Sequence, residues 1–378
     1  MIRRRLPVDS KLFLLTMEAD LVSGMLVQEV SVRAQLSTEG IEWIRGVYHP
    51  FGFRAIATWA NRIIQLLVSI HINKIGVIHC WGTPAGAIGS VLSVLTRRPL
   101  IIDSYEPHAE SMVENGTWKR NSFAFKILFW FEKVQTRRAK YLISANAGMK
   151  AYAKVKYGCE LENMLVKPAC VNFDLFQGKN YKSISLLKEL KLEGMIVCVY
   201  AGKFGGIYLE KETFDFFKTA SDYWGEKFRV LLMTRHSPTE VSAYCRGSGL
   251  DPDIVQVRFV PHHQIADYLG LASFAITPVK PVPTKRYCTP IKNGEYWAMG
   301  LPVVIPANIS DDSDIIRNNH IGAVLEELNK QAYHEAVIKI DALLSEPRSV
   351  LAQKIRAVAM RYRNFEIAEG VYEAIYGR

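Results

Sequence analysis

Short apolar runs alternate with longer amphipathic segments along most of the 378-residue chain. A run of about four to six apolar residues is typical of a strand buried on both faces, and an apolar stripe with a period near 3.6 residues is typical of a helix. Strands and helices that alternate in this way form parallel sheets covered by helices. The pattern therefore predicts an α/β fold.

The first half of the chain is expected to form one doubly wound domain. Its expected strands are 11–16, 41–47, 76–80, 100–103, 141–145 and 164–167. Its expected helices are 23–37, 53–72, 84–95, 122–137 and 149–156. Between 172 and 191, glycine, asparagine, lysine and serine interrupt the apolar periodicity, which indicates a domain boundary.

The pattern then restarts and predicts a second doubly wound domain. Its expected strands are 196–201, 228–233, 254–259, 274–278 and 303–305, and its expected helices are 209–224, 239–248, 265–271 and 295–299. The final stretch, 331–376, is helical by periodicity and can pack on either domain. We therefore expect domains at 1–178 and 179–360, a cleft between them, and a terminal helix at 361–378.

Composition and charge narrow the range of partners. Hydrophobic residues make up 49% of the chain and charged residues 22%, as in folded globular proteins. Residues 1–178 carry 22 Lys and Arg against 14 Asp and Glu, while the remainder carries 25 against 23. The basic first half suits an anionic membrane surface, an acidic acceptor or simply a soluble basic surface. No recognisable nucleic-acid motif accompanies the charge, so no nucleic acid is expected as a partner.

The cysteines and apolar runs indicate a cytoplasmic protein. The six cysteines form no Cys-x-x-Cys pair and no zinc-ligand spacing, which suits a reducing compartment. The apolar run 12–16 is too short for a signal-peptide core, and 63–70, the longest, is too short to span a bilayer. We expect a cytoplasmic location, at the inner face of the membrane if the basic surface binds lipid.

The segment 288–304 combines two kinds of ligand group. A turn with Pro290 and Gly294 is expected to lead into a short helix at Glu295, followed by a buried strand. Backbone N–H groups at a helix start bind phosphate, whereas a carboxylate accepts hydrogen bonds from sugar hydroxyls. Together they indicate a nucleotide sugar as ligand.

Four landmarks in the chain are His79-Cys80-Trp81-Gly82, the segment 103–108, the segment 166–176 and the segment 289–304. They resemble motifs of the retaining GT-B glycosyltransferases of family 4, also called group 1. The resemblance covers nearly the whole chain and implies two Rossmann-like domains facing across a cleft. It implies an N-terminal domain that binds the acceptor and a C-terminal domain that binds the nucleotide-sugar donor.

The resemblance also implies donor-binding residues. That family has Glu, seven residues, then Glu; Glu295 matches the second, which contacts the ribose, but Tyr287 stands where the first is expected. This departure puts the donor sugar in doubt more than the fold. The residues of the segment expected to contact the donor are Thr289, Pro290, Ile291, Lys292 and Glu295. A solvated Glu at a helix start is the alternative interpretation of Glu295.

The loop 201–207 follows a strand and contains glycines such as Gly205, so its amides can approach a phosphate. By resemblance, Lys203 and Lys211 would neutralise the leaving diphosphate, Lys203 also in a catalytic role, with Tyr208 close to the site. A glycine-rich turn with surface lysines is the alternative. Val260, after another strand, would read the base edge.

On the acceptor side, His108 would hydrogen-bond a hydroxyl of the transferred sugar, and Glu106 would orient it or bind acceptor; a structural His is the alternative. Ser23 and Gly24 resemble the family's N-terminal loop near donor phosphate and acceptor, although a turn without ligand is nearly as consistent. No metal and no other cofactor is expected, since His262 and His263 are adjacent and lack a carboxylate triad.

The segment 123–131 is rich in aromatic residues and is flanked by Lys and Arg. Such a helix could enter anionic lipid beside a lipid-linked acceptor, or its aromatics could fill the core of the first domain. Both interpretations remain open on the sequence.

The expected function is metal-independent, hexosyltransferase-like transfer of a sugar from a nucleotide sugar to an acceptor hydroxyl, with retention. The acceptor would be a saccharide or lipid-linked saccharide of cell-surface polysaccharide or glycolipid synthesis. A GT-B nucleotide-sugar epimerase and a non-catalytic GT-B partner subunit are the rival hypotheses. An epimerase should carry several acidic residues around the sugar, and the residue at Tyr287 is the best argument for the non-catalytic subunit.

Overall fold

The computed structural model describes residues 12–16, 26–29, 53–72, 74–176 and 182–377. The chain divides into two compact units: unit 1 is residues 1–167 with 368–378, and unit 2 is residues 168–367. The boundary between the two units, at Lys167/Pro168, lies before the domain boundary at 178 that is expected from the sequence. The intervening residues pack in unit 2, where Val171 and Phe176 are buried in the core.

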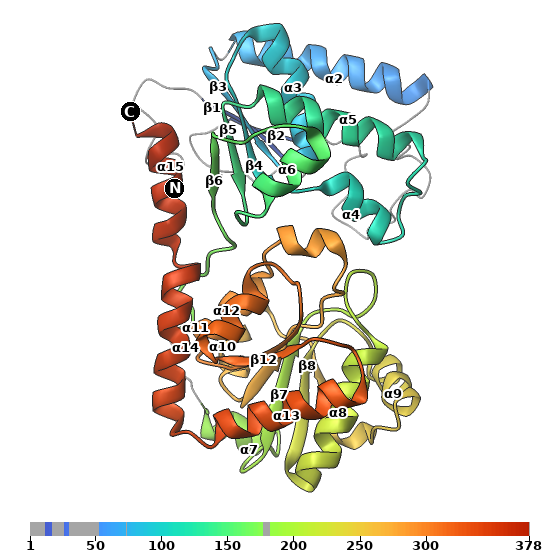
Figure 1. Cartoon of the computed structure of the whole chain (residues 1–378), viewed down its shortest axis with the longest axis vertical. Coiled ribbons are helices and arrows are strands. Elements are labelled where there is room, and N and C mark those ends of the chain that lie inside the picture. Colours follow the sequence, from blue (N-terminus) through green and yellow to red (C-terminus); the bar gives the residue numbers. More distant parts are fainter. Residues whose placement is uncertain (1–11, 17–25, 30–52, 73, 177–181, 378) are drawn as a thin grey trace. The chain divides into compact units, whose positions relative to one another are not determined.

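Unit 1 contains a parallel sheet whose described strands have the order β2-β1-β3-β4-β5-β6 (Figure 1). The strands are β1 (Leu12–Thr16), β2 (Leu26–Glu29), β3 (Val77–Trp81), β4 (Leu100–Tyr105), β5 (Tyr141–Ser144) and β6 (Met164–Val166). Its helices are α2 (Phe53–Ile72), α3 (Thr83–Thr96), α4 (His108–Glu114), α5 (Phe123–Arg138), α6 (Met149–Tyr157) and the larger part of α15 (Phe365–Tyr376). The unit is therefore doubly wound, as the pattern predicts.

One expected element in this unit is wrong and another is not described. Residues 26–29 lie within an expected helix but form a strand, because they pair with β1 in parallel, with Leu26 opposite Phe13. Backbone pairing to a neighbouring strand overrides the local helical pattern there. The expected strand 41–47 lies outside the described residues.

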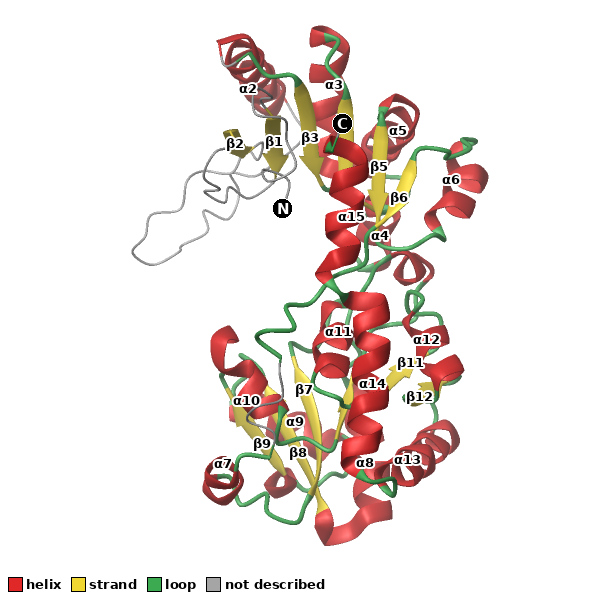
Figure 2. Cartoon of the chain, turned by 90° about the vertical axis from the view of Figure 1, so that its left-hand side faces the viewer, coloured by secondary structure: helices red, strands yellow, loops and turns green. Residues whose placement is uncertain are grey.

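Different helices cover the two faces of the unit 1 sheet. Cys80 on β3 faces α3, since a Cβ on Gly89 would lie 2.2 Å from its Sγ. His79 points to the opposite face because successive strand residues alternate. There its Nδ1 lies 2.5 Å from the hydroxyl of Tyr376 on α15. The end of the chain thus packs on the first sheet, opposite α3, as Figure 2 also shows.

Unit 2 contains a second parallel sheet, with described strands in the order β12-β11-β10-β7-β8-β9. The strands are β7 (Ile196–Ala201), β8 (Phe228–Met233), β9 (Val255–Arg258), β10 (Phe274–Ile276), β11 (Val303–Pro306) and β12 (Gly322–Leu325). The α-helices that lie wholly in it are α7 (Ile184–Glu189), α8 (Lys211–Trp224), α9 (Pro238–Gly247), α10 (Ile265–Leu269), α11 (Ile291–Ala298), α12 (Asp312–Asn319), α13 (Lys330–Leu344) and α14 (Arg348–Arg363). This is the strand order of a Rossmann domain.

Alternate residues of β7 separate the two cores of unit 2. Val197 and Val199 face α11 and α14, whose Trp297 and Ile355 belong to the same cluster. Cys198 and Tyr200 belong to the cluster on the other face, which is filled by residues of α8 and α13. Both faces of the sheet are therefore covered, which explains why its strands are continuous apolar runs.

The sequence pattern misses several boundaries in unit 2. The stretch 331–376 is not one helix: α13 ends before Pro347, which caps α14, and α14 ends at Arg363, with Asn364 as its C-cap. Helix α12 and strand β12 have no counterpart among the expected elements. Helix α7 falls inside the expected break at 172–191. Among the described residues no helix is both long and apolar enough to cross a membrane.

Candidate functional site

The sheet of unit 2 changes winding direction between β7 and β10. In open α/β sheets, ligands bind at the carboxyl ends of the strands that flank such a switch point. The loop after β7 and the segment after β10 meet there: Leu209 N donates to Pro278 O at 2.7 Å, and Lys280 N donates to Ile207 O at 3.0 Å. The topology thus places the glycine loop, the segment 277–280 and α11 at one edge.

The glycine loop keeps its backbone close to its neighbours. A Cβ on Gly202 would lie 2.7 Å from the Tyr200 hydroxyl and 3.0 Å from Cε of Lys292. Gly205 has a φ of 80°, a left-handed conformation in which a side chain is strained. Glycine therefore suits both positions. A loop without side chains there also lets backbone amides approach a ligand.

Lys292 and Tyr208 lie together beside this loop. The ammonium Nζ of Lys292 donates to the hydroxyl of Tyr208 at 3.2 Å and lies 4.6 Å from the centroid of its ring. Lys292 is in the first turn of α11. The N–H groups of Ile291 and Lys292 have no carbonyl acceptor within the helix, because no helical turn precedes them. A flexible cation and a helix start are thus combined, which suits a phosphate group.

The start of α11 corrects the expected position of Glu295. The helix begins at Ile291, with Pro290 as its N-cap residue, and not at Glu295. Gly294, expected in the preceding turn, lies inside the helix, where a Cβ would be 2.5 Å from Cγ2 of Val171, so this helical position needs a glycine. Glu295 therefore stands one turn into the helix, and the helix-start amides belong to the residues before it.

Glu295 is a buried carboxylate beside a histidine. Only 7% of the residue is exposed, and its Oε1 lies 3.6 Å from Nε2 of His262. Burial raises the pKa of Glu295, while His262 and Lys292 lower it to a smaller extent. The sequence singled out His262 only to exclude a metal. No spacing along the chain signals its contact with Glu295, because the two residues come from separate elements.

A buried polar network fixes α11 from behind. Asn293 contacts the hydroxyl of Thr277 at the end of β10 and donates from Nδ2 to Asp312 Oδ2 at 2.6 Å. Asp312 also forms an ion pair with Arg363. Burial raises the pKa of Asp312, and Arg363 and Asn293 offset part of that effect. The network fixes α11 relative to the end of β10. It therefore also fixes the backbone from which the side chains of Lys292 and Glu295 extend.

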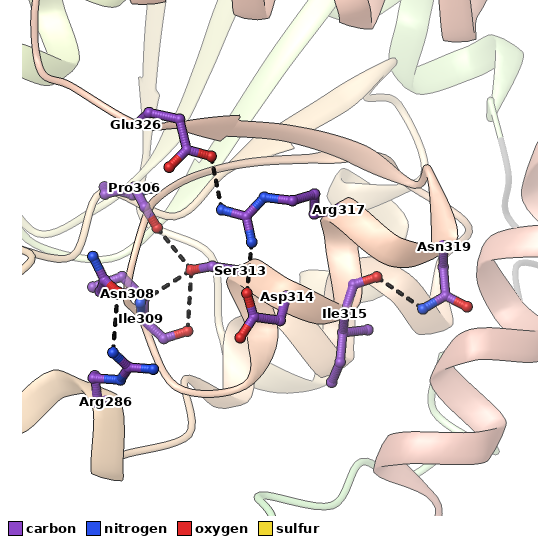
Figure 3. A network of polar contacts seen from close by, with 10 residues as sticks. All are labelled: Arg286, Pro306, Asn308, Ile309, Ser313, Asp314, Ile315, Arg317, Asn319 and Glu326. Atoms are coloured by element: carbon purple, nitrogen blue, oxygen red, sulfur yellow. Dashed lines mark hydrogen bonds and ion pairs between the residues drawn. The ribbon is translucent and has the colours of Figure 1, made fainter. Parts of the chain in front are cut away.

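Hydrogen bonds to Ser313 of α12 hold the turn after β11 (Figure 3). Ser313 anchors this turn: its hydroxyl donates to Pro306 O at 2.9 Å and accepts from Ile309 N at 3.0 Å. The next residue, Ser310, has a left-handed φ of 50°. Its hydroxyl lies 3.4 Å from Oγ1 of Thr289, so this turn packs against the residue that precedes the cap of α11.

The structure also places the other residues that the sequence assigns to the donor side. Lys203 is exposed, and its carbonyl accepts from Tyr200 Oη at 2.7 Å. Lys211 is the first residue of α8 and pairs with Asp215 of the same helix at 2.5 Å. Val260 follows β9 and is half-buried against the core. Tyr287 ends a 3-10 helix, η4 (Pro283–Tyr287), and is half-buried.

On unit 1, Glu106 and His108 follow β4 and lie together. Nδ1 of His108 is 3.4 Å from Oε1 of Glu106, and both side chains are about one-third exposed, at 31% and 36%. His108 is the first residue of α4, a helix that the sequence pattern did not predict. Ser23 and Gly24 lie outside the described residues. In the described part of the chain, no group of three or more His, Cys, Asp or Glu side chains is arranged to hold a metal.

Comparisons with known proteins identify the fold. No protein-family model matches the chain, and no curated protein matches it. Among solved structures, sucrose-phosphate synthase from Thermosynechococcus elongatus is 15% identical, with a TM-score of 0.68 over 97% of this chain and 98% of that one. WaaG, a glycosyltransferase involved in lipopolysaccharide biosynthesis, is 13% identical, with a TM-score of 0.68 over 100% and 93%. Anabaena HepE in complex with UDP is 12% identical, with a TM-score of 0.69 over 97% and 99%.

The chain has the GT-B fold. At these low identities the likeness extends to the fold, with its two Rossmann-like domains, and the chemistry has to be argued from the residues themselves.

Proposed function

We propose that this GT-B chain is a glycosyltransferase that moves a sugar from a nucleotide-sugar donor to an acceptor hydroxyl. The observation that carries the proposal is the arrangement on α11: helix-start amides, the Lys292–Tyr208 pair and, one turn on, the buried Glu295. The amides and ammonium suit a diphosphate, and the carboxylate suits ribose or sugar hydroxyls. HepE, which has the same fold, has been solved in complex with UDP and with UDP-glucose.

The proposed reaction proceeds with retention and without a metal. The bond between the anomeric carbon and the diphosphate oxygen breaks, and the acceptor oxygen bonds to the anomeric carbon on the same face. The proton of the acceptor hydroxyl passes to a phosphate oxygen of the leaving group. Lys292 and the amides of Ile291 and Lys292 would stabilise the charge that develops there, with Lys203 as a second cation.

Unit 1 is proposed to bind the acceptor, a saccharide or lipid-linked saccharide of surface polysaccharide or glycolipid synthesis. His108, oriented by Glu106, would hydrogen-bond a hydroxyl of the transferred sugar. Tyr287 offers one neutral hydroxyl where the resemblance expects a carboxylate, so hexosyl donors with different hydroxyl patterns belong in the test.

The test is a panel of UDP-, GDP- and dTDP-sugars incubated with the purified full chain. Slow hydrolysis or transfer from one donor supports the proposal, inversion at C2 of the sugar supports an epimerase, and no turnover or binding supports a non-catalytic subunit. With the active donor, Lys292→Met should lower kcat/KM by about 10- to 100-fold, the effect of losing charge-assisted hydrogen bonds. Glu295→Ala should chiefly raise donor KM.

The matched control is Lys218→Met. It removes an ammonium that pairs with Asp222 on the surface of the same unit and has no part in the proposed site. Its kcat/KM should equal that of the wild type. Equal losses in the Lys218 and Lys292 variants would refute the site on α11.

A further inference from the structure

Asp103 is a fully buried carboxylate near the carboxyl end of β4, held by partners from three other elements. Its Oδ2 accepts from the Tyr372 hydroxyl of α15 at 2.6 Å and lies 3.5 Å from Nε2 of His79 on β3. Its Oδ1 lies 3.0 Å from the ammonium of Lys167, which follows β6. The same ammonium lies 5.3 Å from the ring centroid of Tyr372. Asp103 thus joins the last helix to the sheet of unit 1.

The carboxylate also stabilises an irregularity in β4. Between Ile102, opposite Leu142, and Tyr105, opposite Ser144, the strand has one more residue than β5. The residue after Asp103 in this bulge, Ser104, has a left-handed φ of 53°. Its N–H donates to Oδ1 of Asp103 at 2.7 Å, which stabilises the bulge. Bulges bend a strand and change the direction of the side chains that follow.

The residues that follow the bulge are those proposed to act on the acceptor side. Tyr105 returns to the pairing with β5, then Glu106 and Pro107 turn the chain, and His108 begins α4. At the other end of this turn, Ala109 N donates to Oε1 of the buried Glu132 at 2.7 Å. The turn is therefore fixed on both sides, by Asp103 before it and by Glu132 after it.

We propose that Tyr372 and Lys167 are positioning residues for the Glu106–His108 turn and act through Asp103. The inference rests on the proposed function only for the role of His108 in transfer. Burial raises the pKa of Asp103, but His79, Lys167 and Tyr372 lower it more, to about 2. The carboxylate therefore stays ionised at neutral pH and accepts all its hydrogen bonds.

Tyr372→Phe in the full chain tests the inference, since it removes only the hydroxyl that reaches Asp103. Hydrogen exchange at the amides of Tyr105, Glu106 and His108 should become about tenfold faster, as expected when a hydrogen bond to a charged group is lost. The transfer kcat should fall about tenfold with donor KM unchanged, because the donor residues lie in unit 2. Lys167→Gln should have the same two effects and provides a second variant if the first folds poorly.

The control is Tyr376→Phe, which removes a hydroxyl of the same helix that contacts His79 and leaves the direct partners of Asp103 in place. Exchange at the turn and kcat should stay at wild-type values. Equal effects of Tyr372→Phe and Tyr376→Phe would mean that both hydroxyls only hold α15 on the sheet, which would refute a specific role of Tyr372. Unchanged exchange in Tyr372→Phe would also refute the positioning role. If His108→Ala leaves kcat unchanged, the proposed role of His108 fails, while the exchange data still decide whether Tyr372 positions the turn.

Discussion

The pKa values of two buried carboxyl groups of unit 1 are shifted in opposite directions from their ordinary values. Burial raises the pKa of both, but Asp103 has Lys167 and His79 as neighbours and its pKa falls to about 2. Glu132 accepts from Ala109 N and from the Tyr157 hydroxyl, both neutral donors, and has Glu110 and Glu106 as like-charged neighbours, so its pKa rises to about 8. The nearest charges, and not burial alone, decide which group is ionised.

Glu132 therefore predicts a pH-dependent stability. Because its pKa is higher in the folded chain than the ordinary value of 4.5, the folded state binds the proton more tightly. Its contribution is complete below about pH 4.5 and is lost as the pH rises through about 8. Relative to Glu132→Gln, the wild type should lose a few kcal/mol of unfolding free energy between these limits.

The measurement is urea unfolding of both proteins at pH 5, 7 and 9. The difference between the two unfolding free energies should change steadily in favour of the glutamine variant as the pH rises. A difference that is the same at all three pH values would show that Glu132 does not titrate in this range.

At the scale of elements, α11 contains a glycine in its interior for a packing reason. Residue patterns place Gly294 in a turn, because glycine disfavours helix interiors. The structure places it inside the helix, where Val171 and Arg363 leave no room for a side chain: a Cβ would lie 2.5 Å from one and 3.2 Å from the other. Packing thus overrides propensity at Gly294, and the helix start at Ile291 places Glu295 in the second turn.

Gly294→Ala should lower the stability of the chain by about 1 to 3 kcal/mol, because the cost of overpacking exceeds the gain in helix propensity. Gly370→Ala is the control: it lies in α15 with nothing within 4 Å of the added Cβ. It should raise stability by up to about 1 kcal/mol. Thermal unfolding of the two variants beside the wild type measures both effects, and a stabilised Gly294→Ala chain would contradict the packing argument.

At the scale of the whole molecule, we propose that unit 1 is the part that binds an anionic membrane surface, because of its charge and its exposed aromatics. Its helix α5 divides its aromatics: Phe125 packs with Leu128 in a small core, while Phe123 and Trp130 are 69% and 58% exposed. The core interpretation of this helix is therefore confirmed for Phe125, and the lipid interpretation stays a prediction that concerns Phe123 and Trp130. Exposed aromatics near basic residues suit an anionic lipid surface.

The chain is accordingly expected to bind vesicles that contain phosphatidylglycerol and to bind neutral phosphatidylcholine vesicles weakly. The double variant Phe123→Ser with Trp130→Ser should bind the anionic vesicles at least about tenfold more weakly, since each exposed aromatic contributes of the order of 1 kcal/mol or more on burial. Phe259→Ser, which removes an exposed aromatic of unit 2, is the control. Flotation would exclude the proposed surface if both variants bind like the wild type.

Much of the fold follows from local patterns in the sequence. The bounds of α2, β7 and β8 agree with those expected, because burial on one or both faces leaves a period that can be followed within a single element. Residues 26–29 and Gly294 depart from expectation where contacts with β1 and with Val171 override the local preference. Helix α4 was missed because its seven residues are too few to establish a period.

By itself, the sequence determined two doubly wound α/β domains and the segments that carry the candidate site, since both depend on the order and spacing of residues along the chain. Only the tertiary structure decided which side chains meet. His262 reaches Glu295, Lys292 reaches Tyr208, and Tyr372 reaches Asp103 across 269 positions of sequence. Such contacts depend on how sheets and helices pack, and hydrophobic periodicity specifies which face of an element is buried without specifying the polar partner that it meets.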